Sequence, residues 1–444
     1  MTPRLARSAA RSAQSAGCYV YIQLPGTTTV VTCGRYEHQV LPNGSGVGRF
    51  AYGQSYLARR DAVPIDPTHL RLRRGTVETA RLGGVFGAIR DAVPDSWGQR
   101  VIERALGRTE ISILDLLLHS PEDRIGALSF GNGPTPPAIV RPFNRVIQLP
   151  ALLEVARQIE EESVSDRPLD PQMHDLLVQG SSALGGARPK NEVEDEDGLW
   201  VAKFPAKGDR WNNAPVEAAM LELARRCGIQ APSTRIERIG SQSALLVKRF
   251  DRDRVAQPST GSGAGARHLR HRMVSALTVL DAEDHVSERK NWSYLRLADE
   301  MQRWSSRPAA DRQELFLRMV LNALVSNTDD HPRNHAFVAP GSEFHLAPVY
   351  DVTPQPTTAI DERHLALEAG QFGRVARRDN LVSLAPRFSL TVDDAHGLID
   401  RMRAIITSEW AAEIRRQGGT VADCHAVRGA FVYAGFEYPS TPQP

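Results

Sequence analysis

The strongest constraint on the fold is an apolar helical pattern that ends abruptly in a polar segment. Residues 311–325 (DRQELFLRMVLNALV) place apolar side chains at helical spacing in a widened stripe, which predicts a buried central helix. The helix must end soon afterwards, because the polar run SNTDDHPRNH at 326–335 contains Pro332. A hairpin-like pair of short strands is expected next, and it delivers Asp351 after LAPVY at 346–350.

Three polar residues of this segment have the spacing and the chemistry of a phosphoryl-transfer site. Asp329 and Asn334 stand five positions apart, and Asp351 follows the expected strand pair. Phosphoryl transfer in protein kinases uses an Asp that accepts the proton of the attacking hydroxyl, and an Asn five residues later that binds Mg²⁺. A second Asp beyond a hairpin bridges the metal and the phosphates. The segment matches this set of residues.

Two other interpretations fit the same residues. Asp and Asn commonly cap helices and turns, so Asp329 and its Asn partner could be purely structural. His331 and His335 stand at i and i+4, and with Asp329 or Asp330 they could instead bind a metal for hydrolysis. Pro332 argues against this histidine pair, because ligands at i and i+4 require an unbroken helical turn.

Upstream, a lysine on a predicted strand precedes a glutamate on a predicted helix. Residues 199–204 (LWVAKF) alternate so that Lys203 shares one strand face with apolar neighbours. A buried ammonium needs an anionic partner, and Glu217 in the helical pattern 215–227, which opens at Pro215, can supply it. The alternative for the lysine is an edge residue whose charge reaches solvent. A glycine-rich loop, a lysine, a glutamate and the Asp–Asn–Asp set in this order favour the kinase interpretation.

Two further segments complete the predicted nucleotide site. The small residues of GSSALGGARPK at 180–190 predict a loop that can lie against phosphates. Residues 244–250 (ALLVKRF) predict a strand that runs into Asp251, where a crossover between two lobes would contact adenine and ribose. The alternative for Asp251 is an ion pair with Arg249 or Arg252. The composition of QPSTGSGAGAR at 257–267 indicates a flexible connector.

Composition excludes several classes of protein. The 444 residues predict two or three packed units, and 54 basic against 52 acidic residues give a net charge of +2. This balance predicts that nucleic acid is contacted only locally or through a partner. The four cysteines lack C-x-x-C spacing, which favours a reducing cytoplasm: Cys18, Cys33, Cys227 and Cys424. No apolar run approaches the roughly 18 residues of a membrane span, so no membrane partner is expected.

A family resemblance covers roughly residues 18–410 and rests on seven motifs: GRFAYGQSYL at 48–57, DAVPDSWGQRVIER at 91–104, DRIGALSF at 123–130, SSALGGARPK at 181–190, VKRFDR at 247–252, SNTDDHPRNH at 326–335 and LAPVYDVTP at 346–354. With these motifs the chain resembles the HipA-type serine/threonine kinases, which are toxins of bacterial toxin–antitoxin modules. The resemblance implies an α+β fold with a protein-kinase-like two-lobed core and an N-terminal α+β subdomain packed on the small lobe. It also implies ATP and Mg²⁺ as cofactors. The implied partner is a helix-turn-helix antitoxin of the HipB type, through which alone operator DNA would be contacted.

By this resemblance, Asp329 is the catalytic base, and Asn334 and Asp351 are the metal ligands. The resemblance implies that the nucleotide is bound by residues of the loop, the lysine–glutamate pair, the crossover and the catalytic loop: Ser182, Ala183, Leu184, Gly185, Gly186, Ala187, Lys190, Lys203, Glu217, Lys248, Arg249, Phe250, Asp251, His331, Arg333 and Asn334. Inactivating autophosphorylation is expected on Ser181 or Ser182.

The expected organisation is a tail, an N-terminal subdomain, a small lobe, a connector and a helical large lobe: 1–17, 18–140, 150–252, 253–266 and 267–435. The expected function is an ATP-dependent serine/threonine kinase toxin of the cytoplasm that phosphorylates a host protein to arrest growth. An aminoacyl-tRNA synthetase such as the glutamyl enzyme is the candidate target. A small-molecule kinase of related fold and a catalytically silent antitoxin-binding scaffold are the alternatives. The intact set of Lys203, Asp329, Asn334 and Asp351 argues against a silent scaffold.

Overall fold

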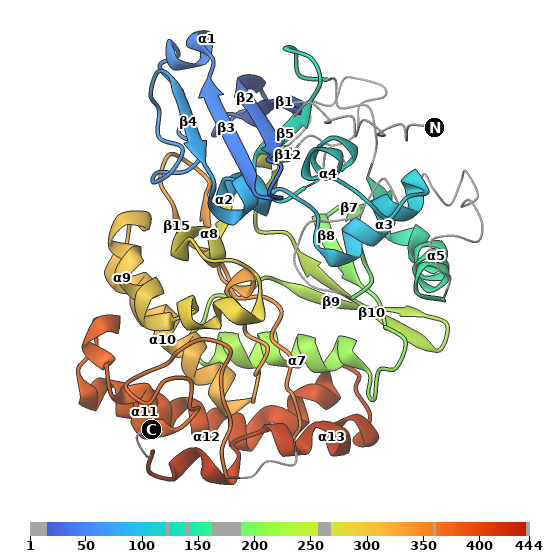
Figure 1. The fold of residues 1–444 in the computed structure, drawn as a ribbon. Helices are drawn as coiled ribbons and strands as arrows, with labels where there is room; N and C mark the ends of the chain where they lie inside the picture. The colour runs from blue at the N-terminus through green and yellow to red at the C-terminus, as the bar shows by residue number, and fades with distance from the viewer. Residues whose placement is uncertain are drawn as a thin grey trace, which may run out of the picture.

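The chain folds into an N-terminal sheet unit, a small lobe built on a second sheet, and a helical large lobe (Figure 1). A computed structural model describes residues 16–120, 124–137, 143–161, 188–255, 268–357 and 361–440. The mixture of helices and strands confirms the predicted α+β class. None of the helices in these ranges is both long and apolar enough to span a membrane.

The N-terminal unit is a five-stranded antiparallel sheet in the order β4-β3-β2-β1-β5, flanked by short helices. Strands β1 and β2 form the hairpin that the alternation in the sequence predicts, with Gly26 at φ 70° in its turn. The strands are β1 (Ala16–Gln23), β2 (Val30–Val40), β3 (Gly46–Tyr52), β4 (Thr76–Thr79) and β5 (Leu128–Gly131). The helices are α1 (Gln54–Leu57), α2 (Gly87–Asp91), α3 (Ser96–Leu106) and α4 (Ile113–His119).

The small lobe is a second five-stranded sheet in the order β6-β7-β8-β10-β9. Its strands are β6 (Asn144–Arg145), β7 (Lys190–Asp195), β8 (Gly198–Lys203), β9 (Thr234–Ile239) and β10 (Gln242–Lys248), and its helices are α5 (Leu149–Glu161) and α7 (Asn213–Arg226). The predicted alternation of β8 is confirmed, because Trp200 and Ala202 pack in one apolar cluster with α5. Helix α7 begins at Asn213, so Pro215 lies within the first turn and not at the predicted first position. Proline is tolerated there because the first N–H groups of a helix have no intrahelical acceptor.

A short antiparallel strand pair, β11 (Arg252–Arg254) and β12 (His268–Arg270), connects the small lobe to the large lobe. The predicted connector at 253–266 therefore begins inside β11, and its residues from 256 onward lie outside the described ranges. The large lobe holds a small sheet of β13 (Arg272–Ser275), β14 (Ala336–Ala339) and β15 (His345–Leu346). Its helices are α8 (Ala276–Leu280), α9 (Tyr294–Trp304), α10 (Pro308–Leu324), α11 (Arg378–Val382), α12 (Val392–Arg416) and α13 (Val421–Val427).

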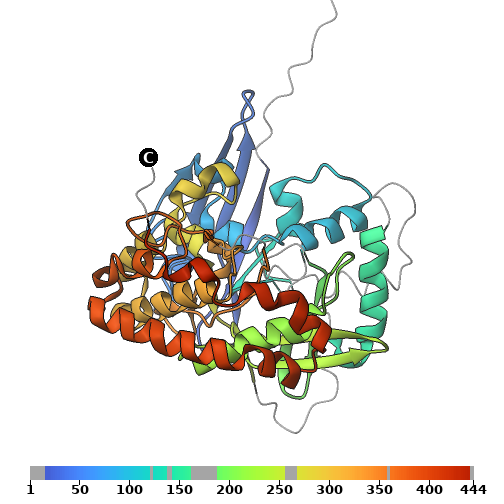
Figure 2. The ribbon, with the colours of Figure 1, turned by 90° about the horizontal axis from the view of Figure 1, so that it is seen from below.

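Helix α10 is the buried central helix that the sequence predicts. Leu315, Phe316 and Met319 are each 0% exposed, and their neighbours in the stripe are buried as well. Around it, α12 lies alongside α7 of the small lobe, which joins the two lobes into one apolar core (Figure 2). The strand pair β14–β15 also forms, but β15 ends at Leu346, so the approach to Asp351 is irregular backbone and not strand.

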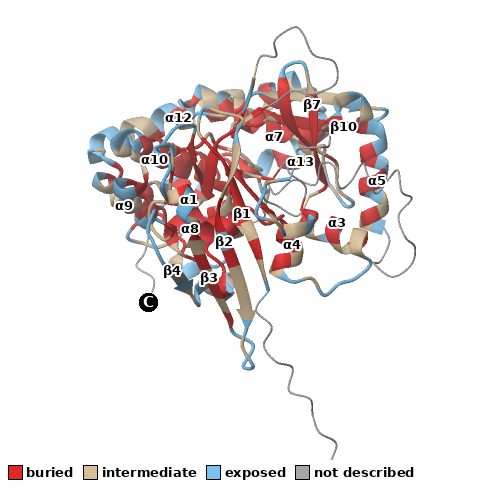
Figure 3. Ribbon diagram, turned by 90° about the horizontal axis from the view of Figure 1, so that it is seen from above, coloured by how far each residue is buried: buried red, intermediate tan, exposed pale blue. Residues whose placement is uncertain are grey.

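The N-terminal unit contacts both lobes, and not only the small lobe as the resemblance implied. Buried positions continue from its sheet through α8 and α10 into α7 (Figure 3). Asp91 at the end of α2 accepts hydrogen bonds from the hydroxyls of Ser275 (2.6 Å) and Thr278 (2.7 Å) in the large lobe. Asp95 forms an ion pair with Lys190 of the small lobe. The N-terminal unit thus spans the boundary between the lobes, where the candidate site lies.

Candidate active site

Lys203, the last residue of β8, holds the two lobes together at the site. Its Nζ lies 2.5 Å from Oε1 of Glu217 on α7 and 2.6 Å from Oδ1 of Asp351 in the large lobe. The predicted pair of a strand lysine and a helix glutamate is therefore present. Burial by itself would lower the pKa of Lys203. The attraction of the Asp351 and Glu217 carboxylates outweighs burial and raises the pKa above its usual value, so the ammonium stays charged.

The two carboxylates beside Lys203 differ in their electrostatic surroundings. Burial raises the pKa of Glu217, and the lysine charge opposes that rise without cancelling it. For Asp351, burial is the largest single effect and raises the pKa, but the charge and hydrogen bond of Lys203, together with the charges of Lys190 and His331, outweigh it and lower the pKa. Asp351 also adopts φ 60°, in the left-handed region that residues other than Gly, Asn and Asp rarely occupy. Such backbone strain is concentrated at functional sites, where the surrounding structure holds it in place.

The segment after α10 forms the loop that carries Asp329 and Asn334. Residues Pro332–Asn334 form the short 3₁₀ helix η4, and Nδ2 of Asn334 donates a hydrogen bond to the Asp329 carbonyl at 3.3 Å. The Asp329 side chain is exposed toward the cleft, whereas Asn334 is buried. Oδ1 of Asn334 has no hydrogen-bond partner within the described structure. A buried amide oxygen without a donor, together with the Asp351 carboxylate, fits the oxygen ligands that Mg²⁺ prefers.

A buried polar network anchors this loop from behind. The Asp330 carboxylate accepts a hydrogen bond from the Tyr294 hydroxyl and lies 2.9 Å from Nε2 of His335. His335 is thus engaged in the interior, and residues 332–334 do not provide the α-helical turn that a His331–His335 metal pair needs. The described ranges contain no group of three or more His, Cys, Asp or Glu side chains arranged to hold a metal. The hydrolytic interpretation therefore has no support in the geometry.

The surroundings of Asp329 raise the pKa of its carboxyl. Although the side chain is open to the cleft, the surrounding protein removes part of the water from its carboxyl, which is the largest effect and raises the pKa; the negative charges of Asp351 and Asp330 add to the rise. The nearby His331 and Arg289 act in the opposite direction without reversing it. A base with a raised pKa holds an abstracted proton better than an ordinary carboxylate does.

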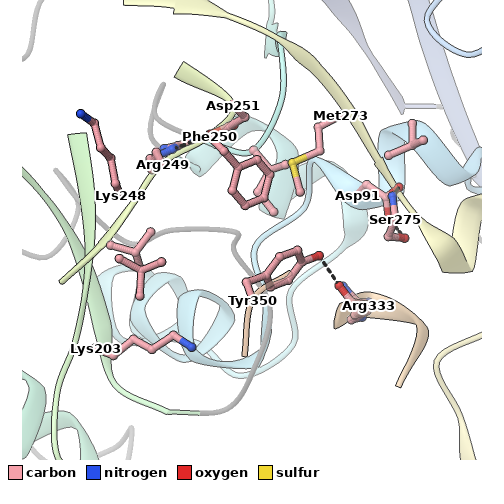
Figure 4. A pocket seen from close by; sticks show the side chains of 14 residues that line it. Asp91, Lys203, Lys248, Arg249, Phe250, Asp251, Met273, Ser275, Arg333 and Tyr350 are labelled. Carbon is pink, nitrogen blue, oxygen red and sulfur yellow. Dashed lines mark hydrogen bonds and ion pairs between the residues drawn. The ribbon is translucent and has the colours of Figure 1, made fainter. Parts of the chain in front are cut away.

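An apolar pocket opens next to Lys203, between β8, β10 and the irregular segment before Asp351. Most of the surface that lines it is apolar, and a few polar groups converge on it, as is typical of small-molecule sites. The rings of Phe250 and Tyr350 lie 5.7 Å apart across it, and Lys203 points in from one side (Figure 4). The Tyr350 hydroxyl donates a 2.6 Å hydrogen bond to the Arg333 carbonyl, which fixes the ring.

Residues 248–251, where the chain was predicted to cross between the lobes, line this pocket. Their charged groups, however, interact with other protein side chains and do not point into the pocket. The Asp251 carboxylate accepts hydrogen bonds from Arg249 and Arg252 and from the Gly126 N–H at 3.0 Å, and the residue is 1% exposed. Burial alone would raise the pKa of Asp251, but the two guanidinium groups hold it well below its usual range. The ion-pair alternative is thus what the structure contains, and the expected ribose contact is not supported. Lys248 points away from the pocket, with Nζ 5.8 Å from the centre of the Trp200 ring (Figure 4).

A polar cleft continues from Lys203 past Asp351 and Asp329. Some of the residues that line it are predicted nucleotide-binding residues, and others are not. His331, Arg333 and Lys190 line it as expected. Lys190 forms a buried ion pair with Asp95 at 2.5 Å, and its charge contributes to the lowered pKa of Asp351. Asp95 caps α3 by accepting a hydrogen bond from the Gly98 N–H, and only this capping role was readable from the sequence.

Other pocket residues carry no local signal of function, because apolar side chains from separate elements form the site only after folding: Ile125, Val201, Val247, Met273, Val274 and Tyr350. The expected loop contacts and modification sites lie outside the described residues: Ser181, Ser182, Ala183, Leu184, Gly185, Gly186 and Ala187.

Comparisons with known families and proteins agree with this architecture. The family model described as the HipA-like C-terminal domain matches residues 182–410, and that of the HipA N-terminal domain matches residues 35–131. A Sinorhizobium fredii protein with the provisional kinase name Y4dM is 25% identical, covering 50% of this chain and 54% of its own length. The serine/threonine-protein kinase toxin HipA of Shewanella oneidensis is 21% identical, covering 62% of this chain and 64% of its own length. The chain thus spans about half to two thirds of these relatives.

One solved structure covers nearly the whole chain. It is HipA from Shewanella oneidensis in a complex with HipB and operator DNA, with a TM-score of 0.65 and 17% sequence identity. The similarity covers 93% of this chain and 94% of that one. At this identity the likeness concerns the fold, and it confirms the predicted arrangement of an N-terminal subdomain on a two-lobed core.

Proposed function

The chain belongs to the HipA family, whose C-terminal domain spans more than half of it, and from this premise we propose that it is an ATP-dependent serine/threonine protein kinase. One observation carries the proposal: the Lys203 ammonium bridges Glu217 and Asp351 in the same cleft that exposes Asp329. A lysine, a glutamate and an aspartate from three elements meet as phosphoryl transfer requires.

Each of these residues would have a separate role in the reaction. The apolar pocket between Val201 and Tyr350 would take the adenine, and Lys203 would bind the phosphates. Asn334 and Asp351 would hold Mg²⁺, which supplies positive charge that offsets the charge developing on the phosphates. Asp329 would accept the proton of the serine or threonine hydroxyl. The hydroxyl oxygen forms the bond to the γ-phosphorus while the bond from that phosphorus to ADP breaks.

The toxin role is a further part of the proposal, and the N-terminal domain match supports it. We expect this chain to bind a helix-turn-helix antitoxin of the HipB type and to reach operator DNA through that partner, in the cytoplasm. A host protein such as glutamyl-tRNA synthetase is the proposed substrate. Phosphorylation of Ser181 or Ser182 would add roughly −1.5 to −2 charge to the loop before β7 and inactivate the enzyme.

The decisive experiment is transfer of labelled phosphate from ATP into a host lysate, with mass spectrometry to identify the modified residue. Wild-type protein should label a small number of proteins on serine or threonine, and Asp329→Asn should label none. Transfer confined to small molecules would identify a small-molecule kinase. ATP binding without any transfer would identify a scaffold. Co-purification with the neighbouring operon product tests the antitoxin, which should be required for operator binding.

A further inference from the structure

A second polar pocket lies on the other side of Asp329 from the nucleotide site. Arg289, Thr328, Asp329, Gln355 and Arg374 contribute to its wall. It shares Asp329 and Gln355 with the cleft that contains Lys203, and it shares no residue with the apolar pocket. The exposed carboxylate of Asp329 therefore separates a nucleotide side from a side that is free for the second substrate.

The charges of this pocket are unbalanced toward positive. Arg289 lies on the 3₁₀ helix η3 (Val286–Asn291), and Arg374 lies on the segment after Asp351. Within the described part of the chain, neither guanidinium has a carboxylate at ion-pair distance, although Arg289 also packs on the Trp292 ring at 6.0 Å. In the neighbouring cleft Arg333 is paired with Asp284 and Arg188 with Asp209, whereas Arg210 has no carboxylate at ion-pair distance among the described residues.

The nucleotide does not account for these two arginines. Its phosphates are expected beside Lys203 and Asp351, and neither of these residues reaches the second pocket. The charge of Arg289 nevertheless acts on Asp329. It lowers the pKa of the Asp329 carboxyl, although the partial loss of water around that carboxyl has a larger effect and raises the pKa. Two guanidinium groups that have no carboxylate partner among the described residues and lie beside Asp329 suit an anionic group of the acceptor, because Arg binds carboxylate and phosphate through two parallel hydrogen bonds.

We propose that the pocket of Arg289 and Arg374 binds an anionic side chain that lies close to the phosphorylated serine or threonine in the protein substrate. The inference rests on the proposed kinase function and deepens it by naming the substrate class. The shared chemistry is an oxyanion, which either an Asp or Glu side chain or a neighbouring phosphoserine can present. The enzyme should therefore select acceptor sites in acidic or already phosphorylated segments.

The test measures kcat/KM on one serine peptide made in four versions, whose flanking residues are neutral, acidic, phosphorylated or basic. Wild-type enzyme should prefer the acidic or the phosphorylated version over the neutral one by about tenfold, as expected for one charge-assisted contact. The version with the greater preference identifies the source of the oxyanion. Arg289→Gln and Arg374→Gln should each reduce that ratio, and Arg289→Glu should shift the preference toward the basic peptide.

Arg401→Gln is the matched control, because Arg401 is an exposed arginine on α12 outside this pocket. It should keep the wild-type ratio, and thermal unfolding should show that each variant is folded. Equal kcat/KM for the acidic, phosphorylated and neutral peptides would overturn the inference and leave the kinase proposal standing. A wild-type ratio in both glutamine variants would do the same. No transfer to any of the four peptides or to lysate proteins would overturn the proposed function and this inference with it.

Discussion

Lys203 and Asp351 stand 148 positions apart in the chain, and their Nζ and Oδ1 atoms lie 2.6 Å apart. This ion pair connects the last residue of β8 in the small lobe with an aspartate of the large lobe whose backbone adopts φ 60°. The surrounding structure holds this left-handed backbone, and the lysine stabilises the charge of the carboxylate. The contact joins the two lobes at the site, so changes at either residue should affect both stability and catalysis.

The first prediction concerns the base. Asp329→Asn should lower the rate of phosphoryl transfer by about 10² to 10⁴, because general-base catalysis typically contributes that much. The side chain is exposed, so the melting temperature should change little. Asp393→Asn on α12, also exposed, is the matched control and should retain full activity. Transfer by Asp329→Asn at the wild-type rate would contradict the assignment.

The second prediction concerns the acid side of the pH–rate profile. A base must be deprotonated, and the pKa of Asp329 is raised by burial, so activity should fall as pH drops through a value above the ordinary Asp pKa of about 3.9. Arg289 lowers that pKa, so Arg289→Gln should move the acid limb to higher pH. The measurement is kcat/KM against pH for both proteins. A limb that moves to lower pH would show that the sign is wrong.

The third prediction concerns the glutamate beside Lys203. Glu217→Gln removes one of two carboxylates from a buried ammonium, and the lysine keeps its contact with Asp351. The free energy of unfolding should fall by roughly 1 to 3 kcal/mol, and ATP should bind more weakly because Lys203 is less well fixed. Denaturant unfolding and nucleotide titration test the two effects separately. Unchanged ATP affinity would mean that Glu217 does not position the lysine.

The fourth prediction concerns the N-terminal unit. Asp95→Asn keeps a good helix cap for α3, because Asn caps as well as Asp does, but it removes the negative charge from the buried Lys190. Since the Lys190 charge acts on Asp351, we expect a loss of kcat/KM for ATP together with lower stability. Asp115→Asn, at the start of α4 and away from the cleft, is the control. Equal activity of the Asp95 and Asp115 variants would exclude a role of Asp95 in the site.

The fifth prediction concerns stability at the crossover. Asp251→Asn leaves the buried Arg249 and Arg252 without a shared carboxylate, and it should cost about 3 to 5 kcal/mol of unfolding free energy at pH 7. The folded-state pKa of Asp251 is depressed, so its stabilisation is present above the unfolded pKa of about 3.9 and is lost as pH falls below it. The difference between wild type and variant should therefore shrink in acid. A difference that is constant from pH 7 to pH 3 would contradict this account.

Local patterns were sufficient to predict much of the scaffold. The helical spacing in 311–325 predicted α10, and the alternation in 199–204 placed Lys203 on the correct face of β8. The spacing of Asp329 and Asn334 predicted the loop, since the chemistry of a short segment depends on neighbours in sequence. The positions that were wrong or incomplete, such as the start of α7 and the extent of β15, are element boundaries, which packing adjusts.

The amino-acid sequence by itself determined the helices, the strands and the set of polar groups that the candidate site contains, because periodicity and residue chemistry act over a few positions. Only the tertiary structure decided how those groups are used. It paired Asp251 with Arg249 and Arg252, brought Asp95 to Lys190, and placed Arg289 beside Asp329. The physical reason is that a charge acts on whatever lies within a few ångströms, and only the packing of separate units brings distant residues so close.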